Sequence, residues 1–186
     1  MRTLQQRLST LGYWLGPPDG VFGALTQQAV YAVQKAASLV PDGVVGPRTS
    51  LALARGVRFR PRSTAGYLVE INLRTDLLMI VRNAKVLVTF NTSTGGGYSY
   101  VSDGARAIAT TPRGVFRILR QVNGLVIAPL GELWRPKYFV GGYAIHGSAS
   151  VPPVPVSHGC VRLTNQAIDW VWASNRMPIG TKVWIY

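Results

Sequence analysis

The only cysteine of the chain, Cys160, lies in the same short segment as its two histidines, His146 and His158. A thiol attacks carbonyls as the thiolate, and a free cysteine is mostly protonated at neutral pH. A neighbouring imidazole can accept that proton and later return it to a leaving amine. These reactive residues, gathered within fifteen positions, therefore predict acyl transfer through a cysteine nucleophile.

The residues around Cys160 offer further groups for such a reaction. Gly159 allows backbone N–H groups to converge on one point, where each would stabilise a tetrahedral oxyanion by about 2.7 to 4 kcal/mol. Arg162 could hold a substrate carboxylate through paired hydrogen bonds. His158 is two residues from the cysteine, whereas His146 reaches it only if the proline-rich segment 151–156 folds back. Spacing alone leaves the choice of base open.

Two other interpretations of these residues stay open on residue chemistry alone. A lone cysteine is often a small buried apolar side chain. A zinc site made of Cys160, His146 and His158 is conceivable, but a fourth ligand and the short spacings of zinc sites are missing. We expect neither a metal nor any other cofactor.

Strand patterns dominate the C-terminal two thirds of the chain. Alternate residues from Val69 to Leu73 are apolar, which predicts a half-buried strand with Glu70 and Asn72 on its other face. A helix capped by Thr164 or Asn165 is expected through 173. Further strands are expected at 77–81, 85–90, 115–119, 125–128 and 182–186, with a hairpin at 83–84. Many short strands and one late helix predict a β-sandwich-like domain.

The first 56 residues have helical periodicity and an internal repeat. Leu4, Leu8 and Leu11 share one helical face. Two glycine-containing segments, 19–23 (DGVFG) and 42–46 (DGVVG), are each followed three positions later by a threonine, and each leads into a helical pattern. We therefore predict three helices at 1–56, a basic linker at 57–65 and the mainly β domain at 66–186.

Composition limits the partners. Twenty Lys and Arg against seven Asp and Glu give a net charge of +13, which favours polyanionic surroundings such as acidic wall polymers or anionic membrane faces. The basic residues are scattered and no nucleic-acid motif is present, so we expect no nucleic-acid partner. No apolar run approaches the roughly 18 residues of a membrane span, and no signal peptide is visible at the start.

Residues 3 to 54 resemble the peptidoglycan-binding domain 1 family. The resemblance rests on the segments 4–8 (LQQRL), 11–13 (LGY), 29–30 (AV) and 33–34 (VQ), together with the two Asp-Gly turns and their threonines. It implies a three-helix module that binds wall glycopeptide. Val33 is a departure, because the family usually has a large aromatic residue at that position.

Residues 66 to 186 resemble the L,D-transpeptidases, also called the YkuD domain family. The matching segments are 146–147 (HG), 157–162 (SHGCVR), 93–95 (STG), 111–116 (TPRGVF) and 180–183 (GTKV). The resemblance implies Cys160 as the nucleophile, His146 as the general base and the Gly147 carbonyl as the group that orients the imidazole. It further assigns the oxyanion hole and substrate binding to Ser157, His158, Gly159 and Arg162, and Tyr138 to a candidate acyl-donor groove at 134–139. The short gap between His146 and Ser157 departs from the family pattern and affects the expected pocket shape.

The implied reaction forms 3→3 cross-links between peptidoglycan stem peptides through a thioester, and carbapenem-type lactams are expected to acylate the same thiol. Stem peptides and glycan are the expected partners, the expected location is extracytoplasmic, and we expect a monomer. The alternatives are an L,D-carboxypeptidase that uses water as acceptor, a wall-binding protein without catalysis, and a general cysteine peptidase. The last would carry its cysteine on a helix with a distant downstream histidine, which the upstream His146 does not match.

Overall fold

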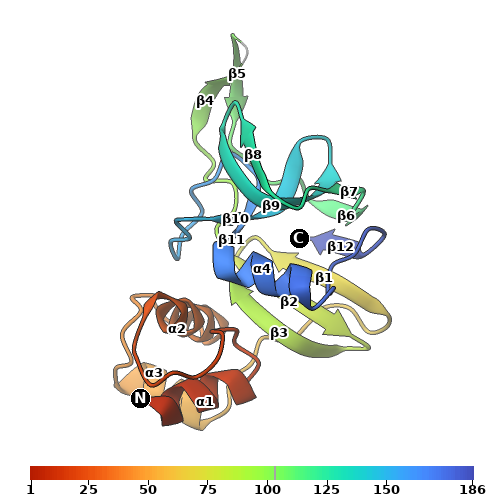
Figure 1. The fold of residues 1–186 in the computed structure, drawn as a ribbon. Coiled ribbons are helices and arrows are strands. Elements are labelled where there is room, and N and C mark those ends of the chain that lie inside the picture. Colours follow the sequence, from red (N-terminus) through yellow and green to blue (C-terminus); the bar gives the residue numbers. More distant parts are fainter. Residues whose placement is uncertain (103) are drawn as a thin grey trace.

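A computed structural model describes residues 1–102 and 104–186. The N-terminal helices lie at one end of the molecule, and the β-sheets, with the C-terminal helix against them, lie at the other (Figure 1). The predicted combination of a three-helix unit and a mainly β, sandwich-like domain is therefore confirmed. The helices are α1 (Arg2–Thr10), α2 (Ala24–Ala36), α3 (Pro47–Ala54) and α4 (Asn165–Ala173). Thr164 caps α4 as predicted, since its hydroxyl accepts a hydrogen bond from the Ala167 N–H at 3.1 Å.

The sequence repeat in the helical unit is organised around two buried glutamines. The Gln5 side-chain amide donates to Asp19, to the Val21 carbonyl and to Thr26, while its oxygen accepts from the Gly20 N–H. Gln34 makes the same four hydrogen bonds to the second turn, with Asp42, Gly43, Val44 and Thr49 as partners. Each Asp-Gly turn is therefore fixed by one glutamine on a preceding helix, which satisfies polar groups that would otherwise be buried without partners.

Within the described residues, the β-domain contains two five-stranded sheets and one two-stranded sheet. The first sheet has the order β3-β2-β1-β12-β6, with β1 and β12 parallel. The second has the order β11-β10-β9-β7, with β8 also paired to β9. β4 and β5 form the separate hairpin. The strand bounds are β1 (Tyr67–Asn72), β2 (Leu77–Arg82), β3 (Lys85–Asn91), β4 (Ser99–Ser102), β5 (Ala105–Ile108), β6 (Gly114–Arg117), β7 (Arg120–Gln121), β8 (Leu125–Ala128), β9 (Gly131–Val140), β10 (Tyr143–Ser148), β11 (Val161–Thr164) and β12 (Lys182–Ile185).

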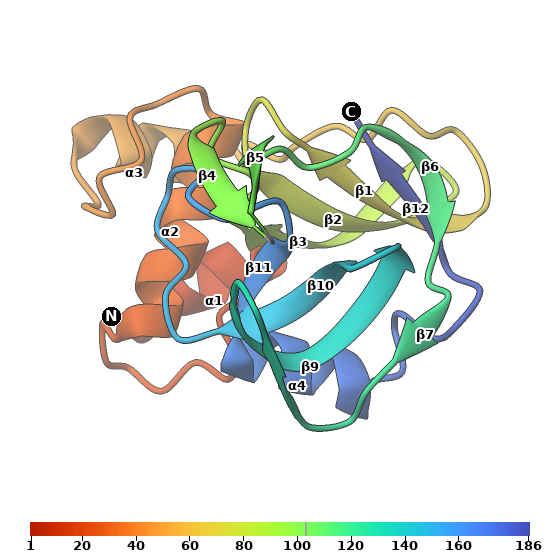
Figure 2. The ribbon, with the colours of Figure 1, turned by 90° about the horizontal axis from the view of Figure 1, so that it is seen from above.

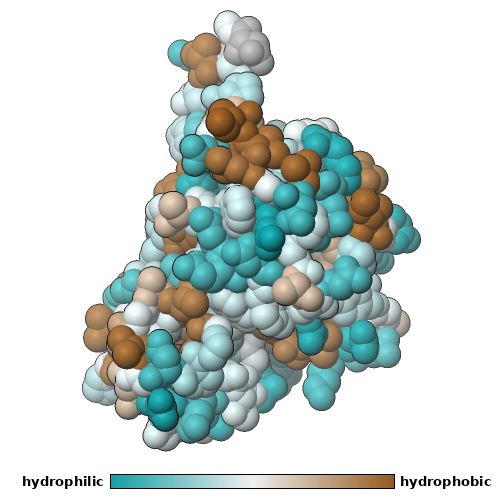
Figure 3. Space-filling view, in the orientation of Figure 1, coloured by the Kyte–Doolittle hydropathy of each residue, from teal (hydrophilic) through white to brown (hydrophobic). Residues whose placement is uncertain are grey.

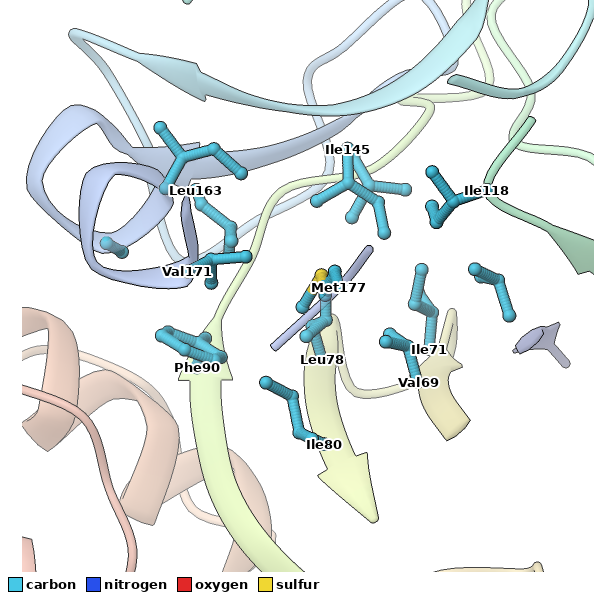
Figure 4. Packing of buried hydrophobic residues seen from close by; sticks show 14 of the residues in the cluster. Val69, Ile71, Leu78, Ile80, Phe90, Ile118, Ile145, Leu163, Val171 and Met177 are labelled. Atoms are coloured by element: carbon cyan, nitrogen blue, oxygen red, sulfur yellow. The ribbon is translucent and has the colours of Figure 1, made fainter. Parts of the chain in front are cut away.

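The main core fills the space between the two larger sheets. Figure 4 shows Ile145 and Leu163 of the second sheet directed toward Ile71 and Leu78 of the first. Helix α4 adds Val171 to the same cluster and packs against β10. The core thus supports β10 and β11 from behind.

The expectation that β1 is half-buried is wrong. Its polar face is covered as well, because the Glu70 carboxylate is fully buried and accepts hydrogen bonds from the N–H groups of Arg62 and Ser63 and from the Tyr186 hydroxyl. Phe59 packs against buried residues of both the helical unit and the first sheet. The basic segment 57–65 is therefore bound along the sheet.

Polar contacts also join the helical unit to the β-domain, and Figure 2 shows α1 and α2 lying alongside the sheets. The Lys35 ammonium of α2 is buried and donates to the Asp76 carbonyl at 3.1 Å, the Asn91 side chain at 2.6 Å and the Thr92 carbonyl at 3.2 Å. Gln28 of α2 donates to the Val151 carbonyl at 2.9 Å. Helix α2 thus contacts the end of β3, at Asn91 and Thr92, and the segment between β10 and β11, at Val151.

Candidate active site

A cavity of about 740 Å³ opens on the second sheet and contains nearly all of the predicted site residues. Gly159 is the exception. The predicted residues on its wall are Tyr138, His146, Gly147, Ser157, His158, Cys160 and Arg162. Segments far apart in sequence therefore meet in one hollow of a size that suits a peptide-like ligand.

Strand pairing brings the cysteine to the strand that carries His146. β10 and β11 are parallel neighbours, with Ile145 opposite Val161 and His146 opposite Arg162. Cys160 directly precedes β11, so by this register it lies opposite Ala144, two residues along β10 from His146, across a strand spacing of about 4.8 Å. The prolines between the two strands return the chain to β10, as a base at His146 requires.

The ring of His146 is held in one tautomer. Its Nδ1 lies 2.8 Å from the Gly147 carbonyl oxygen. Because a carbonyl only accepts hydrogen bonds, Nδ1 carries the hydrogen and Nε2 is left with a free lone pair. Burial lowers the pKa of His146 to about 4, and the nearby Arg162 charge acts in the same direction. His146 is therefore a neutral imidazole at physiological pH.

Gly147 is enclosed as well as hydrogen-bonded. A Cβ at this position would lie 2.7 Å from both Asn165 Oδ1 and Ile168 Cγ2, and 2.9 Å from a carbon of Trp134. Helix α4 thus packs directly on the backbone that orients the imidazole, and only glycine permits this approach.

Cys160 is a partly exposed free thiol. Its Sγ lies 3.8 Å from the Gly142 carbonyl. Burial raises the pKa of the thiol, while a hydrogen bond with the Ala144 backbone and the charge of Arg162 lower it. The raised thiol pKa and the lowered imidazole pKa both favour the uncharged forms of these two groups.

The turn before Cys160 is closed by Ser157. Its hydroxyl donates to the Cys160 carbonyl at 2.6 Å and accepts from the Gly159 N–H at 3.0 Å. Gly159 has φ of +139°, and a Cβ there would lie 2.5 Å from the Tyr143 ring. The Gly159 N–H is therefore engaged within the turn.

The segment that contains Ser93 and Thr94 runs alongside this turn and holds it in place. The Ser157 N–H donates to the Thr94 carbonyl and the Arg162 N–H to the Ser93 carbonyl. Thr111 donates to the Gly159 carbonyl at 2.7 Å. The serine–threonine–glycine and threonine–proline segments that resemble the family therefore support the turn that precedes Cys160.

His158 points to different neighbours from those of His146. Its ring contacts Tyr98 and Tyr100 edge-on, with centroids 5.5 and 4.7 Å away. The hydroxyl of Tyr98 donates to the Val156 carbonyl at 3.2 Å. His158 thus joins the turn to the β4–β5 hairpin.

The 134–139 segment of β9 divides between the cavity and the core. Trp134 and Tyr138 line the cavity, whereas Phe139 is buried in the main core. Arg120, which the sequence did not single out, also lines the cavity and lies over the Tyr138 ring. Figure 3 shows apolar side chains gathered over β8 and the following turn, where Leu125 and Leu130 border the cavity.

Two negative findings apply to residues 1–102 and 104–186. Within them, no group of three or more His, Cys, Asp or Glu side chains is arranged to hold a metal ion. No helix in these ranges has the length and apolar character needed to cross a membrane.

Comparison with known proteins agrees with the geometry. Residues 66–185 match the model of the L,D-transpeptidase catalytic domain, and residues 1–53 match that of a peptidoglycan binding domain. A curated N-acetylmuramoyl-L-alanine amidase, CwlM of Mycobacterium tuberculosis, is 43% identical over 51 residues, which are 27% of this chain and 13% of the amidase. That match is confined to a small part of the amidase.

Solved structures extend the likeness over the whole chain. The L,D-transpeptidase (residues 123–326) of Xylanimonas cellulosilytica is 51% identical with a TM-score of 0.96, covering 100% of this chain and 92% of that one. An L,D-transpeptidase of Stackebrandtia nassauensis shares the fold at 19% identity, with a TM-score of 0.57 over 100% of this chain and 89% of its own. The chain belongs to the L,D-transpeptidase family.

Proposed function

We propose that this enzyme forms 3→3 cross-links in peptidoglycan through a thioester on Cys160, with His146 as the general base. The observation that carries the proposal is that His146, whose Nδ1 is held by the Gly147 carbonyl, and Cys160 lie on the wall of one cavity. A wall-binding protein without catalysis has no physical need for this pairing. We therefore favour the enzyme.

In the first step, the thiol transfers its proton to His146 Nε2 as sulfur attacks the carbonyl of the third stem residue. The tetrahedral intermediate collapses, the imidazolium protonates the leaving nitrogen, and D-alanine departs. In the second step, an amine of another stem attacks the thioester, His146 accepts its proton, and the thiol is restored. No redox partner or metal enters this scheme.

Four further site residues have proposed roles. The turn of Ser157 and Gly159 fixes the Cys160 backbone, whose N–H is the proposed oxyanion donor, and His158 positions this turn through Tyr98 and Tyr100. Arg162, whose charge acts on both reacting groups, is proposed to bind the carboxylate of the departing D-alanine.

The organisation proposed for the chain is a wall-binding module at 1–56, a connecting segment at 57–65 and the catalytic domain at 66–186. Peptidoglycan glycan and stem peptides are the proposed partners, with action outside the cytoplasm. The net charge of +13 supports additional attraction to acidic wall polymers. Carbapenem-type lactams are proposed to acylate Cys160.

Product analysis after incubation with a disaccharide-tetrapeptide tests this function. Cross-linked dimers are expected from the native enzyme and none from the Cys160→Ala variant, which should still sediment with isolated sacculi. Tripeptide without dimers would instead establish an L,D-carboxypeptidase. Dimer formation by the Cys160→Ala variant would exclude the proposed nucleophile.

A further inference from the structure

Arg120 is a second arginine on the wall of the cavity that holds Cys160. It lies on β7 opposite Tyr138 of β9, and its guanidinium carbon is 3.4 Å from the centroid of the Tyr138 ring. Stacking on an aromatic face fixes the plane of a guanidinium and leaves its in-plane N–H groups free to bind a carboxylate. The tyrosine thus serves as a platform that presents the arginine.

The charges around Arg120 favour an anionic ligand. Among the described residues, its guanidinium stacks on Tyr138 and makes no side-chain hydrogen bond or ion pair. The described wall of the cavity carries two arginines, Arg120 and Arg162, and one carboxylate, that of Glu132. Two cations facing one cavity fit a substrate with more than one carboxylate.

We propose that Arg120 binds a carboxylate of the donor peptide other than the one at its C-terminus, and so determines substrate specificity. The inference rests on the proposed function, since it assumes that Cys160 is acylated by a peptide. Arg162 then binds the departing residue, while Arg120 binds a carboxylate of the donor peptide on the other side of the scissile bond. The ligand chemistry is a peptide carboxylate, carried by either the second or the third donor residue.

Strand spacing agrees with this assignment. The order β11-β10-β9-β7 puts three spacings of about 4.8 Å, or about 14 Å, between the strand after Cys160 and the strand of Arg120. An arginine side chain covers nearly half of that distance. An extended peptide advances about 3.4 Å per residue, so a carboxylate on the second residue, or at the end of the third side chain, falls within reach of the guanidinium.

Four synthetic tetrapeptide donors test the proposal with the full-length enzyme and one fixed acceptor amine. They carry a free carboxylate or its amide at the second residue, combined with a free carboxylate or its amide on the third side chain. For the native enzyme, amidation at one of these places should lower kcat/KM by about 10- to 100-fold, the range for losing a hydrogen bond to a charged group. The position that responds identifies the residue read by Arg120.

The Arg120→Gln variant should lose this preference, turning over acid and amide donors at equal kcat/KM, and Arg120→Lys should restore part of it. The matched control is Arg82→Gln, because Arg82 also stacks on a tyrosine, Tyr67, but lies outside the cavity. The control should keep the native preference. Equal losses on acid and amide donors in Arg120→Gln, or a preference that survives it, would overturn the proposal. Absence of turnover of all four donors by the native enzyme would instead count against the proposed function.

Discussion

Replacing Lys35 with methionine tests whether the helical unit and the β-domain form one structural body. The lysine is 8% exposed. Its ammonium donates three hydrogen bonds, to the Asp76 carbonyl, the Asn91 side chain and the Thr92 carbonyl. Burial lowers its pKa to about 8, so it is still charged at pH 7. Methionine fills a similar volume but leaves the Asn91 side-chain oxygen and the Thr92 carbonyl without a donor, whereas the Asp76 carbonyl still accepts from the Thr92 N–H.

The expected loss of stability follows from these contacts. Each buried acceptor that loses its partner costs about 1–3 kcal/mol, and breaking a buried charged interaction from one side costs about 3–5 kcal/mol. We expect the free energy of unfolding to fall by about 3–5 kcal/mol. For a chain of this size, each kcal/mol shifts Tm by about 2–4 °C, which gives a decrease of about 6 to 20 °C.

Thermal and urea unfolding followed by circular dichroism measure this change. Lys85→Met is the matched control, because Lys85 is exposed at the other end of β3 and its loss should alter stability by less than about 0.5 kcal/mol. A double-mutant cycle with Asn91→Leu should show coupling of about 1 kcal/mol or more. A Lys35→Met protein as stable as the Lys85→Met control would refute the inference that this lysine joins the two parts.

Three further predictions concern the site and the helical unit. Because burial lowers the pKa of His146 to about 4 and protonation removes the base, kcat/KM should stay level from pH 7 to about 5 and fall only through pH 4; an acid limb near the ordinary histidine value of 6.5 would contradict this. Gly147→Ala should lower stability by about 1–3 kcal/mol by displacing α4 and should reduce kcat, as measured by urea unfolding and steady-state kinetics; a fully active, equally stable variant would show that the close packing is unnecessary. Gln34→Leu should destabilise the protein by about 1–3 kcal/mol through the four hydrogen bonds to the second turn, and an unchanged unfolding midpoint would count against that role.

Sequence patterns predicted the elements whose burial is periodic. The helices were expected from apolar spacing, the cap of α4 from Thr164, and β8 from its residues 125–128. β9 was not predicted as a strand, because it contains Pro136 and a lysine, Lys137, that is buried against Trp172. A lysine is normally exposed, so a buried lysine disrupts the alternation of apolar and polar residues by which a strand is recognised.

The site was predictable where reactive residues are rare, and less so where it depends on packing. Cys160 and the two histidines stand out by type alone, and the structure brings them to one cavity. Nothing in the sequence around Arg120 distinguishes it from the other scattered basic residues, because its position depends on the β7–β9 pairing. Lys35 was likewise indistinguishable from a solvated helical lysine, since its buried partners come from distant segments.

The central claim is that Cys160 carries the acyl group. Intact-mass spectrometry of the native enzyme, quenched in acid soon after mixing with a tetrapeptide donor and no acceptor, tests it directly. We expect one adduct per chain, with the mass of the donor less D-alanine, mapped by fragmentation to Cys160 and absent from Cys160→Ser. An adduct at another residue, or dimer formation without any adduct on the cysteine under these conditions, would contradict it.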